Sequence, residues 1–238
     1  MTASPLLSAR NITKRFGGVL AVDDVSIAID PLEIKCIIGA NGAGKSTLFN
    51  VLCGVMHASS GALEFEGKEI SDLALYEFAR IGIARKFQVP SVFESLSVEG
   101  NLWVASLNQQ TKTEAAQQIE QMLRLVALVE HRNAIAGTLA HGQKQWLEIG
   151  MALMARPRLL LLDEPTAGMT AAETQDTAEL VRRLAGQTAV MAIEHDMSFV
   201  RTLNCHTYVM HQGRMIVEGS FGDIERNSLV RDVYLGKA

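Results

Sequence analysis

The chain is poor in cysteine, proline and aromatic residues. Its 238 residues include three cysteines, five prolines and 5% aromatic residues. Cys36, Cys53 and Cys205 are far apart in the sequence and form no C-x-x-C motif, so the sequence suggests neither a disulfide framework nor a zinc site. A cytosolic compartment is the expectation that follows.

Long apolar runs and blocks of basic residues are also missing. Residues 1–5 lack the basic-then-apolar order of a signal peptide, and no apolar run approaches the length of about 18 residues that spans a bilayer. The formal net charge is -4, which argues against a protein that coats nucleic acid. We therefore expect any membrane role to come through a partner.

The hydrophobic content is high enough to fill one sizeable interior. At 48% hydrophobic residues and 238 residues in length, the chain suits one α/β domain or a core with a smaller lobe. No internal repeat is present, so the chain contains no second copy of any site.

A phosphate-binding loop of the pattern G-x-x-x-x-G-K-[ST] is the clearest motif. An apolar, β-branched run at residues 34–38 precedes it, and a helical pattern at 46–54 follows. Glycines let backbone N–H groups surround an anion, and a helix N-terminus adds a positive field. The alternative, a glycine-rich turn that binds nothing, does not explain these flanks. The nine residues are Gly39, Ala40, Asn41, Gly42, Ala43, Gly44, Lys45, Ser46 and Thr47.

The residue types in this loop predict a nucleoside triphosphate with Mg²⁺. Lys45 would neutralise charge on the β- and γ-phosphates. The hydroxyl of Ser46 would be a ligand of Mg²⁺.

The first third of the chain outside this loop has strand patterns. Residues 6–13 and 19–29 predict two strands around a turn at 16–18, of the kind found in antiparallel sheets. Phe16 beside that turn is either a hydrophobic plug or a ring that stacks on adenine. Residues 61–67 predict a hairpin arm, and Ser71 and Asp72 are expected to cap a helix that runs to about Arg80.

The middle of the chain changes to helical patterns. Residues 83–87 predict a strand that ends at Gln88. Residues 97–128 predict a smaller helical lobe inserted into the α/β core, with a loop at 109–112. A connector at 131–136 then leads to a helix that starts within residues 139–143, continues through 155 and is stopped by Pro157.

Two carboxylates and a histidine follow later strands. Asp163 and Glu164 end an apolar strand at 159–164, and His195 follows a strand at 188–194. Ligands of open α/β sheets lie at this edge, so a role with a Mg²⁺-bound nucleotide is favoured over a helix cap or a structural histidine. A helix at 171–185, a hairpin at 208–219 around Gln212 and Gly213, and a helix at 229–235 complete the chain.

Together these motifs resemble the ATP-binding subunit of ABC transporters over nearly the whole chain. Residues 39–47 match the Walker A loop, 159–164 the Walker B strand and 139–143 the signature segment that usually reads L-S-G-G-Q. Gln88 matches the Q-loop, His195 the switch histidine, and Phe16 the aromatic residue that stacks on adenine.

The resemblance implies a P-loop NTPase core with a mostly parallel sheet, an N-terminal antiparallel β-subdomain and an inserted helical subdomain. The core would comprise residues 1–88 and 156–238, and the helical subdomain residues 89–155. It also implies the roles of the site residues. Catalysis would involve Glu164, His195 and Gln88; the metal would be held by Ser46, Gln88 and Asp163; nucleotide contacts would come from Phe16, Gly39, Asn41, Gly42, Ala43, Gly44, Lys45, Ser46, Thr47, Ala140, Gly142 and Gln143.

This chain departs from the family pattern within the signature segment and after the Walker B strand. Ala140 replaces a serine that contacts the γ-phosphate bound to the opposite subunit, and His141 replaces a glycine. Thr170 stands where the D-loop usually has Asp, and Leu32 where a turn glycine is common. One lost hydroxyl donor typically costs about 1 kcal/mol.

Finer features resemble importers of branched-chain amino acids and related amides. The run from His141 to Met151, together with residues 86–88, resembles most the ATPase subunit of urea importers. The expected function is therefore to energise uptake of urea or a related amide across the cytoplasmic membrane. Alternatives are a branched-chain amino acid importer, a lipopolysaccharide-export ATPase, an ABC ATPase of DNA repair or translation, and a P-loop kinase or GTPase.

The resemblance also implies partners. Two ATPase subunits, identical or paralogous, would face head to tail with ATP between the Walker A loop of one and the signature helix of the other. Two transmembrane permeases and a periplasmic or extracellular substrate-binding protein would complete the assembly, and nucleic acid is not expected. The subunit would lie on the cytoplasmic face of the membrane, and the helical lobe and residues 89–93 would pass motion to the permeases.

Overall fold

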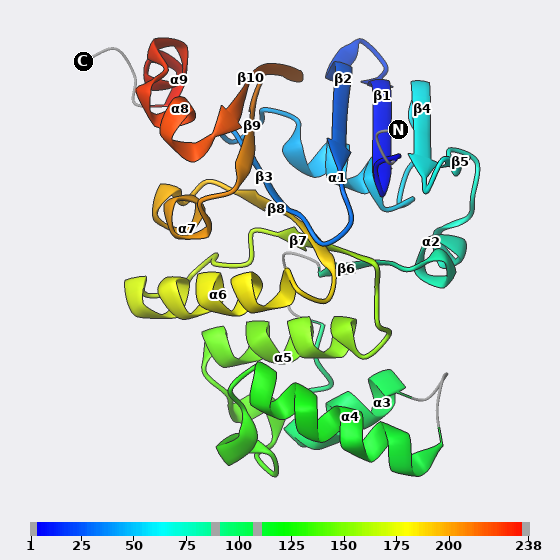
Figure 1. The fold of residues 1–238 in the computed structure, drawn as a ribbon, viewed down its shortest axis with the longest axis vertical. Coiled ribbons are helices and arrows are strands. Elements are labelled where there is room, and N and C mark those ends of the chain that lie inside the picture. The colour runs from blue at the N-terminus through cyan, green and yellow to red at the C-terminus, as the bar shows by residue number, and fades with distance from the viewer. Residues whose placement is uncertain (1–3, 87–90, 107–110, 235–238) are drawn as a thin grey trace.

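The computed structural model describes residues 4–86, 91–106 and 111–234. Figure 1 shows an antiparallel sheet at one end, a group of helices at the other, and a mainly parallel sheet between them. Among the described residues, no helix is both long enough and apolar enough to cross a membrane.

The antiparallel sheet has the strand order β2-β1-β4-β5. Its strands are β1 (Leu7–Phe16), β2 (Val19–Ile29), β4 (Ser60–Phe65) and β5 (Lys68–Glu69). In β2, Val25, Ile27 and Ile29 are buried while Ser26 is exposed, which is the two-residue alternation of a sheet with one covered face. The antiparallel sheet expected from the N-terminal pattern is confirmed.

The second sheet has the order β10-β9-β3-β8-β7-β6. Neighbouring strands from β9 to β6 are parallel, and β10 is antiparallel to β9. The bounds are β3 (Ile34–Ile38), β6 (Ile83–Lys86), β7 (Leu159–Asp163), β8 (Ala189–Glu194), β9 (His206–His211) and β10 (Arg214–Ser220). Since β3, β7 and β8 are strands with helices or a sheet on both faces, their near-continuous apolar sequences are the expected pattern.

Helices cover both sheets and form a separate group. Those of the core are α1 (Lys45–Leu52), α2 (Leu75–Ile81), α6 (Ala171–Leu184), α7 (Met197–Leu203), α8 (Phe221–Arg226) and α9 (Ser228–Tyr234). The helical group contains α3 (Val98–Ser106), α4 (Lys112–Leu125) and α5 (His141–Leu153), joined by short 3₁₀ helices at Val129–His131 and Ala136–Thr138. Its division from the core at residues 89 and 155 stays a prediction.

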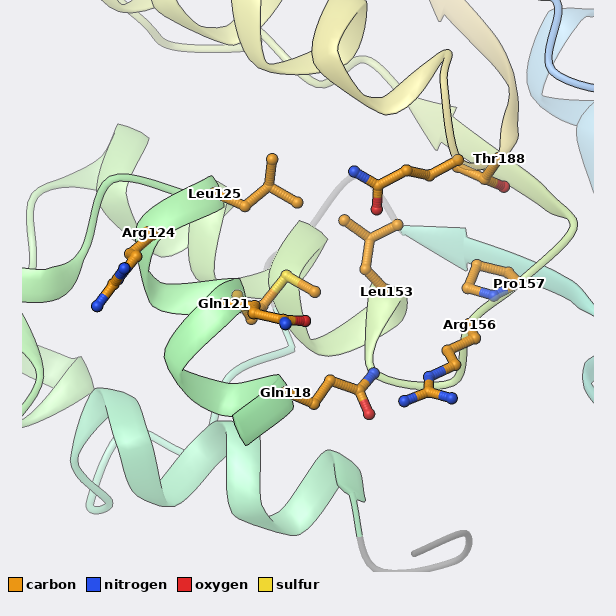
Figure 2. Close-up of a pocket in the computed structure, with 10 residues that line it drawn as sticks. Gln118, Gln121, Arg124, Leu125, Leu153, Arg156, Pro157 and Thr188 are labelled. Carbon is orange, nitrogen blue, oxygen red and sulfur yellow. The ribbon is translucent and has the colours of Figure 1, made fainter. Parts of the chain in front are cut away.

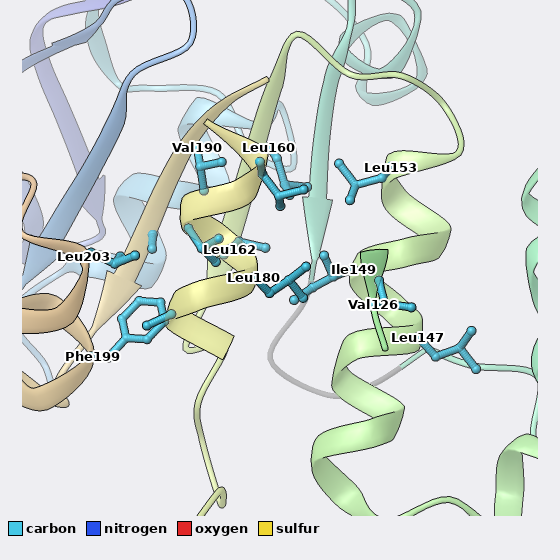
Figure 3. Packing of buried hydrophobic residues seen from close by; sticks show 14 of the residues in the cluster. Val126, Leu147, Ile149, Leu153, Leu160, Leu162, Leu180, Val190, Phe199 and Leu203 are labelled. Atoms are coloured by element: carbon cyan, nitrogen blue, oxygen red, sulfur yellow. The ribbon is translucent and has the colours of Figure 1, made fainter. Parts of the chain in front are cut away.

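Alternate residues of β7 enter two different hydrophobic cores. Leu159 and Leu161 contact a core that includes α1 and the antiparallel sheet. Leu160 and Leu162 contact a core that continues through α6 into the helical group (Figure 3). Because one core spans the sheet and α5, movement of α5 against β7 must repack shared apolar contacts.

A fully buried ion pair also joins the sheet to the helical group. Lys86 at the end of β6 lies 3.7 Å from a carboxylate oxygen of Glu148 on α5, and their side chains are 0% and 8% exposed. The other oxygen of Glu148 accepts a hydrogen bond from the backbone N–H of Ser91. Burial lowers the pKa of Lys86 and raises the pKa of Glu148, and each partner opposes that shift in the other.

Two of the cysteines that are distant in sequence are neighbours in space. The sulfur atoms of Cys36 and Cys205 lie 3.3 Å apart, with Cys36 buried and Cys205 partly exposed. The hydrogen bond between the thiols and burial raise the pKa of Cys36, whereas the same hydrogen bond lowers the pKa of Cys205 and burial opposes that shift. All three cysteines are free thiols.

One predicted helix cap and one predicted loop boundary are wrong. Ser71 and Asp72 do not cap α2, because the Ser71 hydroxyl accepts a hydrogen bond from the Leu63 N–H and the helix begins later, after Ala74. Lys112 does not belong to the predicted loop at 109–112 but begins α4, where the Thr111 side chain caps the helix. Residues 109 and 110 of that loop lie outside the described residues.

Removal of Lys86 tests the buried ion pair. We expect Lys86→Met to lower the free energy of unfolding by about 3 kcal/mol near pH 8, because it leaves Glu148 buried without its cation. The pKa of Glu148 in the folded variant then rises further above its unfolded value. Since the folded state takes up this proton first, the loss of stability should shrink as pH falls towards about 5.

Urea denaturation at several pH values is the measurement. The double variant Lys86→Met/Glu148→Gln is the control, and it should recover most of the lost stability and lose the pH dependence. An equal loss of stability at pH 5 and pH 8 in the single variant would contradict the interpretation.

Candidate functional site

The phosphate loop lies between the end of β3 and the start of α1. Gly44 adopts φ 101 and is the residue before the first turn of α1. A Cβ atom at Gly44 would collide with the carbonyl oxygen of Ala21, and one at Gly39 would collide with that of Met210. Glycine is therefore required at both positions, since strands β2 and β9 pack directly against the loop.

A cavity of about 370 Å³ opens over this loop. The Ala43 carbonyl accepts a hydrogen bond from the Gly213 N–H, and the Gly213 carbonyl accepts one from the Asp23 N–H, so the β9–β10 turn joins the loop to β2. The cavity is lined by Val19, Leu20, Ala21, Asn41, Gly42, Ala43, Gly44, Lys45, Ser46, Thr47, Glu164, Gln212 and Gly213. A run of backbone N–H groups at a helix N-terminus is an anion site.

Lys45 is a buried residue that lines this cavity. Its Nζ donates hydrogen bonds to the carbonyl oxygens of Gly39 at 2.6 Å and Ala40 at 3.1 Å. Burial lowers the pKa of Lys45, while the carboxylates of Glu164 and Asp163 oppose that shift. Two carbonyl dipoles compensate a buried ammonium only in part, so an anionic ligand here gains a strong electrostatic interaction.

Asp163 at the end of β7 is held by an arginine that the sequence reading did not single out. Arg85 on β6 forms an ion pair with Asp163 Oδ2 at 2.6 Å, and both side chains are under 10% exposed. The same guanidinium donates to Asn50 Oδ1 on α1 at 2.5 Å. Arg85 thus connects the helix of the phosphate loop to the two strands β6 and β7.

Glu164 and His195 meet at the same edge of the sheet. His195 Nδ1 lies 3.6 Å from Glu164 Oε1, and the histidine side chain is 52% exposed. Glu164 itself is in the left-handed region at φ 46, which is unusual for a residue with a Cβ and marks a functional candidate. Its backbone N–H donates to the Ile193 carbonyl of β8, which fixes the turn after β7.

Glu194 is a second residue that the sequence reading missed. It is 0% exposed, and its Oε1 accepts hydrogen bonds from the Thr166 N–H at 3.0 Å and the Thr166 hydroxyl at 2.7 Å. Burial raises the pKa of Glu194, and these hydrogen bonds oppose the shift. The signal in the sequence was a carboxylate inside an apolar strand, next to His195.

The predicted signature residues lie at the N-terminus of α5, away from the cavity lining. Ala140 precedes the first turn, and its N–H donates to Gln143 Oε1 at 3.1 Å. Gly142 packs so closely on α6 that a Cβ would lie 2.6 Å from Glu173 Oε1. None of Ala140, Gly142 and Gln143 lines the 370 Å³ cavity.

The two remaining predicted site residues are Phe16 and Gln88. Phe16 ends β1 and is 48% exposed beside the start of β2, whose first residues line the cavity, but Phe16 itself does not line it. Its predicted stacking on adenine stays a prediction. Gln88 lies outside the described residues.

A larger cavity of about 680 Å³ lies elsewhere, between α4, the end of α5 and the segment before β8 (Figure 2). Gln118, Arg156 and Thr188 are among its lining residues. It contains neither a glycine-rich loop nor a long helix N-terminus, so volume alone does not identify the site. The phosphate loop and the carboxylates do.

The residues around the 370 Å³ cavity fit a magnesium ion. Asp163 Oδ1 is buried and has no hydrogen-bond partner among the described residues. This carboxylate oxygen and the Ser46 hydroxyl are the hard oxygen donors that Mg²⁺ prefers. Within the described ranges, no group of three or more His, Cys, Asp or Glu side chains could hold a metal ion.

Comparison with known proteins gives a consistent result. The family model described as ABC transporter matches residues 22–167. The chain is 37% identical to the high-affinity branched-chain amino acid transport ATP-binding protein BraF of Pseudomonas aeruginosa, over 98% of this chain and 99% of that one. It is 36% identical to LivG of Escherichia coli K12, a protein of the same description, over 99% and 100%.

A solved structure also superposes closely. It is the ADP conformation of an ATP-binding cassette of an ABC transporter, with a TM-score of 0.87 and 30% identity over 98% of this chain and 100% of that one. The expected fold, an ABC ATPase fold with one antiparallel and one mainly parallel sheet, is confirmed.

Lys45→Ala tests the phosphate loop. We expect a loss of nucleotide affinity of at least about tenfold, because a charge-assisted contact to phosphate disappears. Lys68→Ala removes the same charge from exposed strand β5 and is the matched control. Equilibrium titration with a fluorescent nucleotide measures both, and equal affinities for the two variants would remove Lys45 from the site.

Proposed function

This chain belongs to the ABC transporter family, and we propose that it is the ATP-hydrolysing subunit of an importer whose subunits work in pairs at the cytoplasmic face of a membrane. ATP is its substrate and Mg²⁺ its cofactor. The observation that carries the proposal is the meeting of Lys45, Asp163, Glu164 and His195 at one sheet edge.

The phosphate loop would bind and orient the triphosphate. Its backbone N–H groups and Lys45 counter the phosphate charge, and the rigid support from β2 and β9 keeps them in place before the nucleotide arrives. Donors fixed in advance need no reorganisation as charge develops on the γ-phosphate.

Glu164 would hold the attacking water, and His195 would contact the γ-phosphate. His195 Nδ1 lies 3.6 Å from Oε1 of Glu164, which lines the cavity. A bound Mg²⁺ would neutralise charge between the phosphates, and Ser46, Asp163 and Gln88 are the residues proposed to hold it. Arg85 leaves Asp163 Oδ1 available for this purpose.

A second subunit would complete the site. The N-terminus of α5 carries Ala140, Gly142 and Gln143 but none of these lines the cavity of its own chain. A head-to-tail pair would bring the N–H groups of this 13-residue helix to the nucleotide of the partner. Because Ala140 has no hydroxyl, these backbone groups supply the donors.

A mostly apolar groove of about 640 Å³ is our candidate for contact with the permeases. Leu75 and Tyr76 of α2 line it and are 53% and 60% exposed, which is unusual for large hydrophobic side chains. The far wall is formed by Met151 and Ala152 of α5. A partner bound in this groove would contact both the core and the helical group. Relative movement of these two parts would therefore change its contacts.

For the transported molecule, we propose a branched-chain amino acid. The similarity to BraF and LivG over nearly the whole chain supports the alternative in the sequence analysis better than urea. A urea importer is the second candidate, favoured by the run from His141 to Met151 and by Lys86, which forms the buried pair with Glu148.

Glu164→Gln tests the hydrolytic role. We expect kcat to fall by about 100-fold or more, because the base is lost, while ATP affinity stays within about twofold. Glu69→Gln on exposed strand β5 is the matched control and should hydrolyse ATP at the normal rate. Steady-state phosphate release and nucleotide titration measure the two quantities, and an unchanged kcat would exclude Glu164 as the base.

Uptake measurements test the transported molecule. Cells that lack this gene should lose high-affinity uptake of radiolabelled leucine, and the wild-type gene should restore it whereas the Glu164→Gln variant should not. Loss of urea uptake with normal leucine uptake would reverse the assignment. Normal uptake of both would contradict each candidate.

A further inference from the structure

We propose that His141 is a positioning residue that ties the turn after Glu164 to the N-terminus of α5 and so links the two nucleotide sites of a subunit pair. This inference rests on the proposed function. His141 stands where the resembling family has glycine, so the link depends on a side chain that the family pattern lacks.

The link is a hydrogen bond between the signature segment and the turn at residues 164–168. His141 Nε2 lies 2.9 Å from the carbonyl oxygen of Ala167. A carbonyl oxygen only accepts, so the histidine nitrogen must carry a hydrogen and donate it. The Ala167 N–H in turn donates to the Glu164 carbonyl at 3.1 Å. His141 therefore reaches the same short turn that carries the proposed catalytic base.

This turn is fixed on its other side by β8. Glu194 accepts both hydrogen bonds from Thr166, and Glu164 is held in the left-handed region at φ 46. Gly168, at φ 74, lies so close that a Cβ would sit 3.3 Å from His141 Nε2. The turn at residues 164–168 is therefore held to β8 on one side. On its other side, the His141 contact decides whether the turn moves only with the sheet or also with α5.

The α5 side of the link is equally constrained. Trp146 Nε1 donates to the Thr177 hydroxyl of α6 at 2.8 Å. Gln145 is 0% exposed, its Nε2 lies 3.3 Å from His141 Nε2, and its Oε1 has no hydrogen-bond partner among the described residues. A half-turn of the Gln145 amide presents the oxygen to the histidine N–H, which then donates to both oxygens.

The His141 hydrogen bond connects the elements that serve two different nucleotides in the proposed pair. In the proposed pair, the N-terminus of α5 contacts the nucleotide of the partner, whereas the turn at 164–168 holds the base for the chain's own nucleotide. The His141 hydrogen bond joins these two elements directly. Occupation of one site then favours the hydrolysis-competent turn at the other, which is a coupling between sites.

Three variants of His141 separate the hydrogen bond from mere packing. His141→Phe keeps a planar ring without a donor, His141→Gly restores the family residue, and His141→Gln keeps an N–H at comparable reach. Steady-state ATP hydrolysis by the full-length chain is measured against ATP concentration. For the Phe and Gly variants we expect kcat to fall about fivefold, the size of effect that one lost neutral hydrogen bond produces.

The Hill coefficient is the readout that a purely structural role would not change. It should exceed 1 for the wild type and the Gln variant and fall to about 1 for the Phe and Gly variants. Affinity for a fluorescent nucleotide, titrated at a protein concentration where the chain is monomeric, should be the same for all four proteins, because His141 does not line the cavity. Thermal unfolding checks that each variant is folded.

Three outcomes would overturn the inference. These are a wild-type Hill coefficient of 1, normal kcat and cooperativity in His141→Phe, or a loss in His141→Gln as large as that in His141→Phe. Failure of the proposed function is a different result, namely no ATP hydrolysis by the wild type together with no nucleotide-dependent pairing of the Glu164→Gln variant by light scattering.

Discussion

Parallel pairing of β3, β8 and β7 is the constraint on which the site depends. Their register aligns Ile38 with Glu194 and Asp163 with Ile193, so the carboxyl ends of all three strands reach one edge together. The phosphate loop, the carboxylates and His195 follow those ends directly in the chain. A one-residue slip of β7 would turn Asp163 to the opposite face of the sheet. The hydrophobic cores on both faces prevent that slip, since Leu159 and Leu160 belong to different cores.

Several groups at this edge are less stable than they would be with a ligand present. Lys45 is buried and donates hydrogen bonds to two carbonyl oxygens, Asp163 Oδ1 is buried without a hydrogen-bond partner among the described residues, and Glu164 has a strained backbone. Functional sites commonly concentrate such groups, because the surrounding structure over-determines them. Arg85 donates a partly buried hydrogen bond to Asp163, and Glu194 accepts a buried one from the Thr166 hydroxyl, so these two residues support the edge.

Local patterns predicted most of the fold and of the candidate site. The phosphate loop, the strand before Asp163 and the hairpin around Gln212 and Gly213 each have a sequence signal of a few adjacent residues. Contacts between distant segments have no such signal, and these include Arg85 with Asp163 and Cys36 with Cys205. The short helices α7 and α8 were missed because six or seven residues show little periodicity, although Asp196 and Ser220 cap them. The start of α2 was misplaced because the Ser71 hydroxyl bonds to β4 instead.

The proximity of Cys36 and Cys205 has a practical consequence for labelling. Cys36 and Cys53 are buried, so Cys205 is the one thiol of the three that reagents in solution can reach. The hydrogen bond between the two thiols lowers the pKa of Cys205, which increases the fraction of reactive thiolate at neutral pH. Cys205 immediately precedes β9, which pairs with β3 and packs against the phosphate loop at Gly39. Because Cys205 lies just before the start of β9 and Met210, which touches Gly39, lies near its end, a fluorophore attached here would sit at the opposite edge of the sheet from the cavity.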